Sequence, residues 1–355
     1  MHFINFWYSR AITPIKFHKE LLNALVHRGA KVRIICKQDP FSEELKTWCD
    51  ERGIELINLR GGVVLWLSKF FWLCCSYRSQ KHVVNTPVVG VLFSLAARVF
   101  RIQDCLFICH GLTSTDSRKT NPRILKTLEI FGLNGYRKCV FVSESLCNYA
   151  RFNLNYKKSS VIITSACGAT PKIRNRDNMM LTVGMLARLS EAKGVRDFIK
   201  ISKLAHRLRL PFQFIIAGIP EKIIVFEEIQ AAVAAGYLTY PGHLSGGSID
   251  RFYRNLGFYL STSFREGFGM AALEAQSYGI PVLGYNIIGI KDCVTHQKTG
   301  YLTPPGDIVA VIETLLLYLL DPELYSAHSA AAINRVRMCF SPQKIANQYI
   351  ETIYQ

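Results

Sequence analysis

The chain has 355 residues, of which 49% are hydrophobic and 19% are charged, and its formal net charge is +17. That length exceeds what one ordinary core requires and fits two domains of roughly 150 to 180 residues. The hydrophobic content excludes a disordered chain, and no segment has the run of about 20 apolar residues that spans a bilayer.

The positive charge is concentrated in the first half of the chain. Residues 1–170 contain 24 Lys and Arg against 11 Asp and Glu, whereas residues 171–355 contain 19 against 15. A basic half attracts phosphates, nucleic acid or the anionic cytoplasmic face of a membrane. A solvated basic surface is the alternative interpretation.

The 11 cysteines are scattered and include no pair of CxxC motifs. Since the N-terminus shows no secretory signal, we predict reduced, buried thiols in a cytoplasmic protein. The cysteine spacing predicts no zinc site, and no Asp-x-Asp pair is present to bind another metal. We therefore expect neither a cofactor nor a metal.

Short apolar runs alternate with longer amphipathic segments in the first half of the chain. The predicted helices include Phe17–His27 and Val88–Phe100, whose apolar residues recur at helical spacing. The predicted strands are Phe3–Phe6, Val32–Cys36, Ile54–Leu59, Val83–Val84, Leu106–Cys109, Val140–Ser143 and Val161–Ile163. Such alternation predicts a parallel sheet covered by helices on both faces.

The segment Val63–Cys75 is strongly apolar and allows two interpretations. It is a candidate for a buried helix of the first domain, because it is short and interrupted by Lys69. Its aromatic residues, followed by basic ones, also suit a helix that lies in the membrane interface.

A polar patch, Pro171–Asn178, has the composition of a linker. The alternation then restarts with the predicted strands Met180–Met185, Phe212–Ala217, Tyr237–Tyr240, Gly257–Leu260 and Pro281–Gly284. The predicted helices between and after them are Val195–Arg207, Lys222–Ala235, Gly269–Tyr278 and Ile308–Leu320. We predict two doubly wound α/β domains with a cleft between them, residues 1–170 with a returning helix at 341–355, and residues 175–340.

A glycine loop follows the predicted strand that ends at Leu260. Gly267 and Gly269 let the backbone approach a ligand closely, and the next helix offers unpaired N–H groups and a partial positive charge. This arrangement predicts a phosphate site. Glu266 before the helix and Glu274 within it are placed to bind hydroxyls at either end of a diphosphate, which is the layout of a nucleotide-sugar. Surface carboxylates around an ordinary turn are the alternative.

Residues 182–306 resemble the donor domain of retaining glycosyltransferases of family 4, which have the GT-B fold of two Rossmann-like domains. The resemblance rests on Arg265–Tyr285 (REGFGMAALEAQSYGIPVLGY), on Thr182–Gly194 (TVGMLARLSEAKG), on Gly289–Asp292 and on Thr299–Asp307. Tyr240–His243 stands where the family has a short strand ending in glycine. These motifs occur in the family's order over about 125 residues.

The resemblance implies specific roles in binding the donor. Arg188 and Lys193 would neutralise the diphosphate, and stabilising a developing negative charge is usually the largest single contribution to catalysis. Glu266 would orient the hydroxyls of the sugar, and Glu274 would bind the ribose. The donor-binding residues implied are Gly184, Arg188, Lys193, Glu266, Gly267, Phe268, Gly269, Met270, Ala271 and Glu274.

The first half resembles the same class more weakly, in the subfamilies that build capsules, exopolysaccharides and O-antigens. By this resemblance His110, at the end of Leu106–Leu112, would face the donor sugar and join Arg188, Lys193 and Glu266 as a catalytic residue. Ser145 resembles another family element, although capping a helix is a sufficient role for it. The loop Tyr8–Pro14 lacks the family's glycine pair, so either Arg10 contributes to the phosphate site or this loop shapes the acceptor pocket.

The function implied is transfer of a sugar from a nucleotide-diphosphate-sugar, expected to be a UDP-sugar, with retention at the anomeric carbon. The acceptor would be a hydroxyl of a lipid-linked or polysaccharide glycan in surface polysaccharide (O-antigen, capsule or lipopolysaccharide) synthesis. The expected partners are the donor, this acceptor and the anionic inner face of the cytoplasmic membrane, which the protein binds peripherally, with no nucleic acid. A nucleotide-sugar epimerase of the same fold and a non-catalytic sugar-nucleotide-binding subunit are the alternatives.

Overall fold

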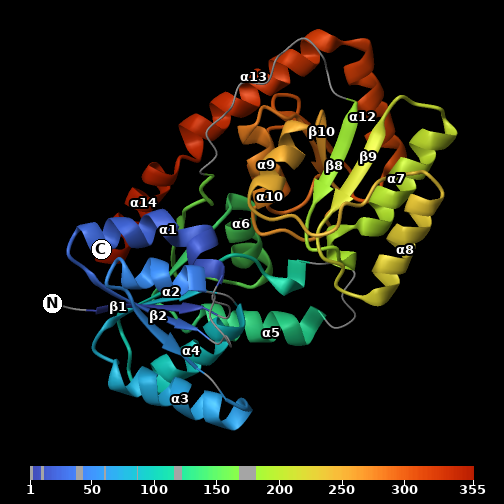
Figure 1. Ribbon diagram of the computed structural model, residues 1–355. Coiled ribbons are helices and arrows are strands. Elements are labelled where there is room, and N and C mark those ends of the chain that lie inside the picture. Colours follow the sequence, from blue (N-terminus) through green and yellow to red (C-terminus); the bar gives the residue numbers. More distant parts are fainter. Residues whose placement is uncertain are drawn as a thin grey trace. The chain divides into compact units, whose positions relative to one another are not determined.

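The computed structural model describes residues 3–8, 12–36, 43–59, 61–85, 87–115, 122–167 and 181–355. The chain divides into two compact units (Figure 1). Unit 1 comprises residues 1–166 and 342–355, and unit 2 comprises residues 167–341. The proposed linker Pro171–Asn178 and residues 9–11 of the Tyr8–Pro14 loop lie outside the described residues.

Unit 1 contains a parallel sheet with the strand order β3-β2-β1-β4-β5-β6-β7. Its strands are β1 (Phe3–Tyr8), β2 (Lys31–Cys36), β3 (Glu55–Asn58), β4 (Lys81–Asn85), β5 (Cys105–Cys109), β6 (Lys138–Phe141) and β7 (Ser159–Ile162). The central strands are buried along nearly their whole length, because helices cover both faces of the sheet.

The helices of unit 1 are distributed over the two faces by the right-handed crossovers between its parallel strands. The helices α1 (Ile12–His27) and α2 (Glu43–Asp50) lie on one face, and α3 (Val63–Ser76), α4 (Pro87–Val99) and α5 (Pro122–Leu133) lie on the other (Figure 1). Helix α6 (Glu144–Asn153) follows β6, and the terminal helix α14 (Pro342–Tyr354) packs against α1.

Unit 2 contains a parallel sheet with the strand order β12-β11-β10-β8-β9. Its strands are β8 (Thr182–Leu186), β9 (Gln213–Ala217), β10 (Phe258–Ser261), β11 (Val282–Tyr285) and β12 (Gly300–Thr303). Its helices are α7 (Val195–Arg207), α8 (Ile223–Ala234), α9 (Gly247–Arg254), α10 (Met270–Ser277), α11 (Ile290–Cys293), α12 (Ile308–Leu320) and α13 (Pro322–Cys339). A 3-10 turn, η2 (Glu191–Lys193), follows β8.

The strand order of unit 2 creates a switch point between β8 and β10. From β8 the chain continues to β9 on one side, whereas β10 and the later strands lie on the other. The loops after the two strands, residues 187–194 and 262–269, therefore diverge from neighbouring strand ends. Doubly wound sheets bind ligands outside the carboxyl ends of their strands at such a point. In unit 1 the corresponding strands are β1 and β4.

These two sheets confirm the predicted fold class, two doubly wound α/β domains. One predicted strand is wrong: Tyr237–Tyr240 contributes only an isolated bridge between Thr239 and Ile215. Pro241 and Gly242 follow at once and prevent the strand from extending. Gly300–Thr303, for which no strand was predicted, forms the edge strand β12.

Helix α3 is not wholly buried, which corrects the interpretation of Val63–Cys75 as a buried helix. Phe70, Leu73 and Cys74 are buried, whereas Val64 is 83% exposed and Trp72 is 65% exposed. None of the described helices is both long and apolar enough to cross a membrane.

A neutral histidine is part of the core of unit 1. The Trp7 indole N–H donates to Nδ1 of His82 at 3.0 Å, and Nε2 of His82 lies 3.0 Å from the Tyr77 carbonyl oxygen. These two contacts fix the tautomer, with the proton on Nε2. A second proton, on Nδ1, would face the Trp7 indole N–H, so that two donors would oppose each other. Burial lowers the pKa of His82 to about 4.

We predict that the stability of unit 1 falls as the pH drops from 6.5 towards 4. The unfolded state binds a proton on His82 that the folded state resists, so at pH 5 this group alone removes about 2 kcal/mol. Urea unfolding at pH 7.5 and pH 5, followed by tryptophan fluorescence, measures the loss in unit 1, where all four tryptophans lie. His82→Gln should reduce this dependence by the share of His82, with His110 keeping its own share, and the exposed-site control His243→Gln should leave the dependence unchanged. Equal slopes in the two variants would contradict the assignment.

Candidate functional site

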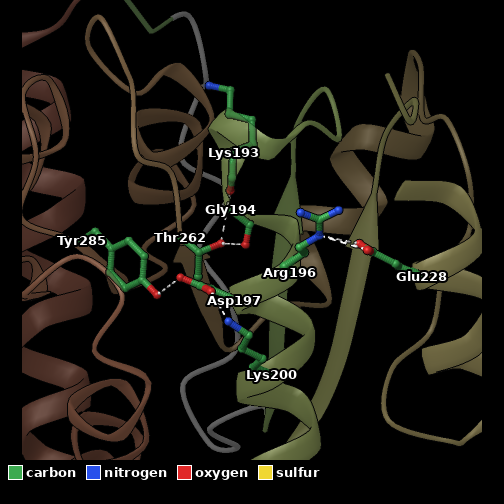
Figure 2. A network of polar contacts seen from close by, with 8 residues as sticks. All are labelled: Lys193, Gly194, Arg196, Asp197, Lys200, Glu228, Thr262 and Tyr285. Atoms are coloured by element: carbon green, nitrogen blue, oxygen red, sulfur yellow. Dashed lines mark hydrogen bonds and ion pairs between the residues drawn. The ribbon is translucent and has the colours of Figure 1, made fainter. Parts of the chain in front are cut away.

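The loop after β8 is fixed against the loop after β10 by one threonine. The Thr262 hydroxyl donates to the carbonyl oxygen of Gly194 at 2.9 Å and approaches that of Lys193 at 3.2 Å (Figure 2). Gly194 has φ of +68°, and a Cβ there would lie 1.9 Å from the Thr262 carbonyl oxygen. The close approach therefore requires glycine at this position, and it places the backbone of Lys193 at the end of β10.

The start of α7 is joined to β11 by a buried carboxylate. Asp197 accepts the hydroxyl of Tyr285 at 2.9 Å and the ammonium of Lys200 at 3.2 Å (Figure 2). It lies in the first turn of α7, where a negative charge interacts favourably with the helix dipole. Arg196, on the same turn, pairs with Glu228 of α8 at 3.0 Å. Strands β10 and β11 thus both fix the segment that carries Lys193.

Two predicted site residues form an ion pair at the switch point. The Lys193 ammonium contacts Oε1 of Glu266, and the Ser263 hydroxyl donates to the same oxygen at 3.0 Å. The two charged side chains are only 21% and 18% exposed. In Figure 2 the Lys193 side chain extends away from Gly194 and Thr262, whose contacts involve only the backbone of Lys193 and Gly194. The pair places opposite charges in a partly desolvated setting, where electrostatic interactions are strengthened.

The glycine loop and α10 form the second part of the site. Gly269 has φ of +91° and is the N-cap residue of α10, and a Cβ on it would lie 2.7 Å from Ile290. A Cβ on Gly289 would lie 2.8 Å from the Gly267 carbonyl, so the two loops are in close contact. The first turn, with Met270 and Ala271, contains no acidic side chain and presents N–H groups without helical partners.

Phe268 and Gly184 have packing roles that the sequence interpretation did not anticipate. Phe268 is 3% exposed, and its ring packs against Phe340 with centroids 5.4 Å apart, so its side chain lies in the core. Gly184 lies inside β8 and not in the loop that follows. A Cβ at Gly184 would lie 2.4 Å from Leu256, so packing by itself requires a glycine there.

Glu274 is oriented by a tyrosine from another helix. Tyr253, on α9, donates its hydroxyl to Oε2 of Glu274 at 2.8 Å and lies 3.3 Å from the Ala271 carbonyl oxygen. Its ring stacks on that of Tyr278 with centroids 5.3 Å apart. Burial, and then the adjacent Glu274 carboxylate, raise the pKa of Tyr253 well above its usual value, so the phenol remains a donor.

We predict that Tyr253→Phe raises the donor KM about tenfold with little change in kcat, because a hydrogen bond to a charged group orients Glu274. Initial rates measured over a range of donor concentrations give the two constants. Tyr325→Phe is the matched control, since the Tyr325 hydroxyl donates to the Gly257 carbonyl at 3.1 Å, a backbone acceptor. The same KM in both variants would contradict a positioning role for Tyr253.

Arg188 lies on the loop between β8 and η2, and its side chain is exposed. Nη1 of Arg188 lies 3.9 Å from Glu221, and the two side chains are 53% and 47% exposed, so this ion pair is weak. The neighbouring backbone is fixed, because Leu189 N–H donates to the Ile219 carbonyl at 2.9 Å. Lys193 and Glu266 are therefore in contact, whereas Arg188 is paired with a different carboxylate.

His110 lies in unit 1, directly after β5. Its Nε2 lies 3.2 Å from Oδ1 of Asn85 at the end of β4, and its ring lies 5.4 Å from that of His18. The Tyr8 hydroxyl in turn lies 3.0 Å from Nδ1 of His18. Burial lowers the pKa of His110 to about 4, so its imidazole is neutral at pH 7. A neutral imidazole can accept or donate a hydrogen bond, but it supplies no fixed positive charge.

Ser143, and not Ser145, caps α6. The Ser143 hydroxyl accepts the Leu146 N–H at 3.3 Å, and Ser145 is buried within the first turn. Within the described ranges, no group of three or more His, Cys, Asp and Glu side chains could bind a metal ion. The described cysteines form no disulfide with one another; nine of them are buried, as predicted, whereas Cys75 and Cys339 are exposed.

The architecture and the site together define a class of protein: two Rossmann-like units, the second with a cationic loop and a glycine-preceded helix at its switch point, as in GT-B glycosyltransferases. The family model for glycosyl transferases group 1 matches residues 169–335. This region is a group 1 glycosyl transferase domain, and the predicted resemblance is confirmed.

Similar proteins agree with this assignment. The capsular polysaccharide biosynthesis glycosyltransferase CapM of Staphylococcus aureus is 22% identical over 302 residues, which cover 78% of this chain and 77% of CapM. The sucrose-phosphate synthase of Thermosynechococcus elongatus superposes with a TM-score of 0.83 at 17% identity, covering 100% and 99% of the two chains. HepE of Anabaena, in complex with UDP and glucose, superposes with a TM-score of 0.78 at 15% identity and 100% coverage of both chains. These structures share the fold of this chain.

Proposed function

We propose that this glycosyltransferase uses a nucleotide-diphosphate-sugar, with UDP as the nucleotide, and transfers the sugar with retention at the anomeric carbon. The observation that carries the proposal is the Lys193–Glu266 pair at the switch point, next to the N-terminus of α10. A diphosphate bears several negative charges, and the sugar and ribose on either side bear neutral hydroxyls. The site offers cations and N–H groups to the diphosphate. For the hydroxyls on either side it offers two carboxylates, Glu266 before α10 and Glu274 within that helix.

The chemistry follows from the charge that develops on the leaving group. As the bond between the anomeric carbon and the β-phosphate oxygen breaks, its electron pair stays with the diphosphate. Lys193, Arg188 and the N–H groups of Gly269, Met270 and Ala271 stabilise this charge in a protein environment, which is effective because these donors are already oriented. This cationic set neutralises the diphosphate without a metal in our proposal.

The acceptor hydroxyl attacks on the face that the diphosphate leaves. Its oxygen forms the new bond to the anomeric carbon, and its proton passes to the departing phosphate oxygen, so that no separate protein base is needed. Glu266 exchanges part of its contact with Lys193 for the hydroxyls of the sugar. His110, neutral at pH 7, contributes a hydrogen bond to the sugar and not a charge. Glu274, oriented by Tyr253, binds the ribose.

We further propose that unit 2 binds the donor and unit 1 the acceptor, a lipid-linked or polysaccharide glycan of O-antigen or capsule type. The basic first half of the chain suits an acceptor that carries a diphosphate at an anionic membrane face. The similarity to CapM, which is described as a capsular polysaccharide biosynthesis enzyme, supports an acceptor of this type. The protein would then act on the cytoplasmic side, peripherally attached to the membrane.

Incubation of the purified chain with UDP-glucose, UDP-N-acetylglucosamine and GDP-mannose tests the proposal, with and without a lipid-linked acceptor. We expect acceptor-dependent release of UDP and an α-linked product from an α-linked donor. An epimerised donor would favour an epimerase. Tight binding of UDP, with no UDP produced from any UDP-sugar, would favour a non-catalytic subunit. Either outcome would overturn the proposed transfer.

A further inference from the structure

Three helices of unit 1 form one continuous layer over a single face of its sheet. Helix α3 packs against α4, and α4 packs against α5 (Figure 1). The rings of Phe70 and Phe93 lie 6.4 Å apart at the first contact, and the Arg98 guanidinium lies 4.0 Å from the ring centre of Phe131 at the second. The outward sides of α3, α4 and α5 are therefore parts of one surface, which we call the α3–α5 face.

Large apolar side chains project from every helix of the α3–α5 face. They include Val64 (83% exposed) and Trp72 (65%) on α3, Leu95 (43%) and Val99 (62%) on α4, and Ile124 (58%) and Leu128 (48%) on α5. The residues of α4 and α5 follow i, i+4 spacing, so each pair lies along one side of its helix. Single exposed apolar residues need no explanation, whereas a set on adjacent helices marks an interaction surface.

The charges of the α3–α5 face are positive. The three helices contain four basic residues, Lys69, Arg98, Arg123 and Lys126, and one acidic residue, Glu129. Glu129 is buried and accepts the N–H of Thr113 and the hydroxyl of Ser114, so it does not offset the charge outside. A second copy of this basic surface would repel it, and an anionic partner would attract it.

We propose that the α3–α5 face docks on an anionic lipid bilayer. The apolar side chains enter the boundary between headgroups and acyl chains, Trp72 lies at the headgroup level, and Arg98, Arg123 and Lys126 contact lipid phosphates. This surface refines the membrane attachment of the proposed function. The sequence indicated only the α3 segment as a candidate for membrane contact, and not α4 or α5.

Sedimentation with vesicles tests the proposal on the full chain. We expect binding to vesicles of phosphatidylcholine mixed with phosphatidylglycerol, weaker binding to phosphatidylcholine alone, and a loss of binding at high salt. A triple variant, Val64→Ser with Trp72→Ser and Leu128→Ser, should weaken binding by more than about tenfold. The matched triple control is Phe152→Ser with Val309→Ser and Leu320→Ser, which removes side chains that are 84%, 57% and 83% exposed elsewhere. It should bind as the unmodified chain does.

A charge variant examines the electrostatic part separately. Arg123→Gln with Lys126→Gln should weaken binding to anionic vesicles roughly 25-fold, since each basic residue near the surface contributes about fivefold. Arg207→Gln with Lys298→Gln, on the exposed surface of unit 2, is its control. Equal binding of all variants, or equal binding to neutral and anionic vesicles, would overturn the proposal.

A fluorescence measurement keeps the test independent of the folding of the triple variant. Brominated lipid should quench the exposed Trp72 in the unmodified chain, and Trp72→Phe should remove that quenching. Absence of quenching, or a dimer that protects Trp72 from an aqueous quencher, would overturn the docking. UDP binding is measured without lipid, so a chain that binds UDP but no vesicles separates failure of this inference from failure of the proposed donor site.

Discussion

Replacing Lys193 with methionine is expected to lower kcat/KM for sugar transfer by about 10²- to 10³-fold. Methionine keeps the length and apolar stem of the side chain but removes the cation that we place against the leaving diphosphate. It also removes the partner of Glu266, which would retain only the Ser263 hydroxyl among the contacts described here. Two contributions, lost charge stabilisation and a misplaced carboxylate, therefore act in the same direction.

The matched control is Lys298→Met, which removes an exposed lysine from another loop of unit 2. Initial rates of UDP release for both variants, together with thermal unfolding, separate catalysis from stability. We expect normal rates from the control and near-normal melting of both. A Lys193→Met enzyme with unchanged kcat/KM would show that the ion pair at the switch point is only structural.

Gly194→Ala is expected to destabilise unit 2 by at least about 3 kcal/mol and to abolish most transfer. The left-handed backbone of an alanine costs about 1–2 kcal/mol by itself. In addition, the new Cβ would lie 1.9 Å from the Thr262 carbonyl oxygen, a backbone atom that can move only by displacing the end of β10. Such a displacement would also shift Lys193.

Gly236→Ala separates the two contributions. Gly236 has φ of +73°, close to the +68° of Gly194, but a Cβ there would have no atom within 4 Å. Calorimetry should show a loss of about 1–2 kcal/mol for Gly236→Ala, from backbone strain alone. Similar melting temperatures for the two variants would mean that the Gly194–Thr262 contact relaxes easily and does not position the loop.

The fold could be predicted from the sequence because apolar runs and helical periodicity were consistent along most of the chain. The helices Val195–Arg207 and Ile308–Leu320 were predicted with the bounds that the structure shows. The local sequence pattern gave the wrong secondary structure where pairing with another strand decides whether a strand forms. The short segment Gly300–Thr303 becomes a strand only because β11 lies beside it, and Tyr237–Tyr240 is interrupted by the residues that follow.

The candidate site was predicted as a set of motifs and not as a set of contacts. Spacing placed Lys193 and Glu266 in loops after neighbouring strands, but their ion pair depends on η2 and on Thr262, which no motif identified. Tyr253 was missed because it lies on α9, a helix that was not predicted, and its link to Glu274 exists only in three dimensions. The cue available in the sequence was an apolar pair, Phe252 and Tyr253, among charged neighbours.

Gly184 and Phe268 were predicted to bind the donor, but the structure shows that they have packing roles. Both stand in donor-binding motifs, yet the structure explains their identity by contacts with Leu256 and Phe340. A motif residue can be required by the scaffold that supports a site as well as by the ligand. His110 is a further motif residue with a contact to the scaffold, because its neutral imidazole is held by Asn85 in unit 1.

We propose above that unit 2 binds a nucleotide-diphosphate-sugar and stabilises its leaving diphosphate through Lys193. Release of UDP from a radiolabelled UDP-sugar panel, measured for the unmodified chain and for Lys193→Met with a lipid-linked acceptor present, tests it most directly. We expect acceptor-dependent release of UDP, with transfer of the labelled sugar, and a decrease of at least about a hundredfold in the variant. Absence of release with every donor, or equal release from both proteins, would contradict it.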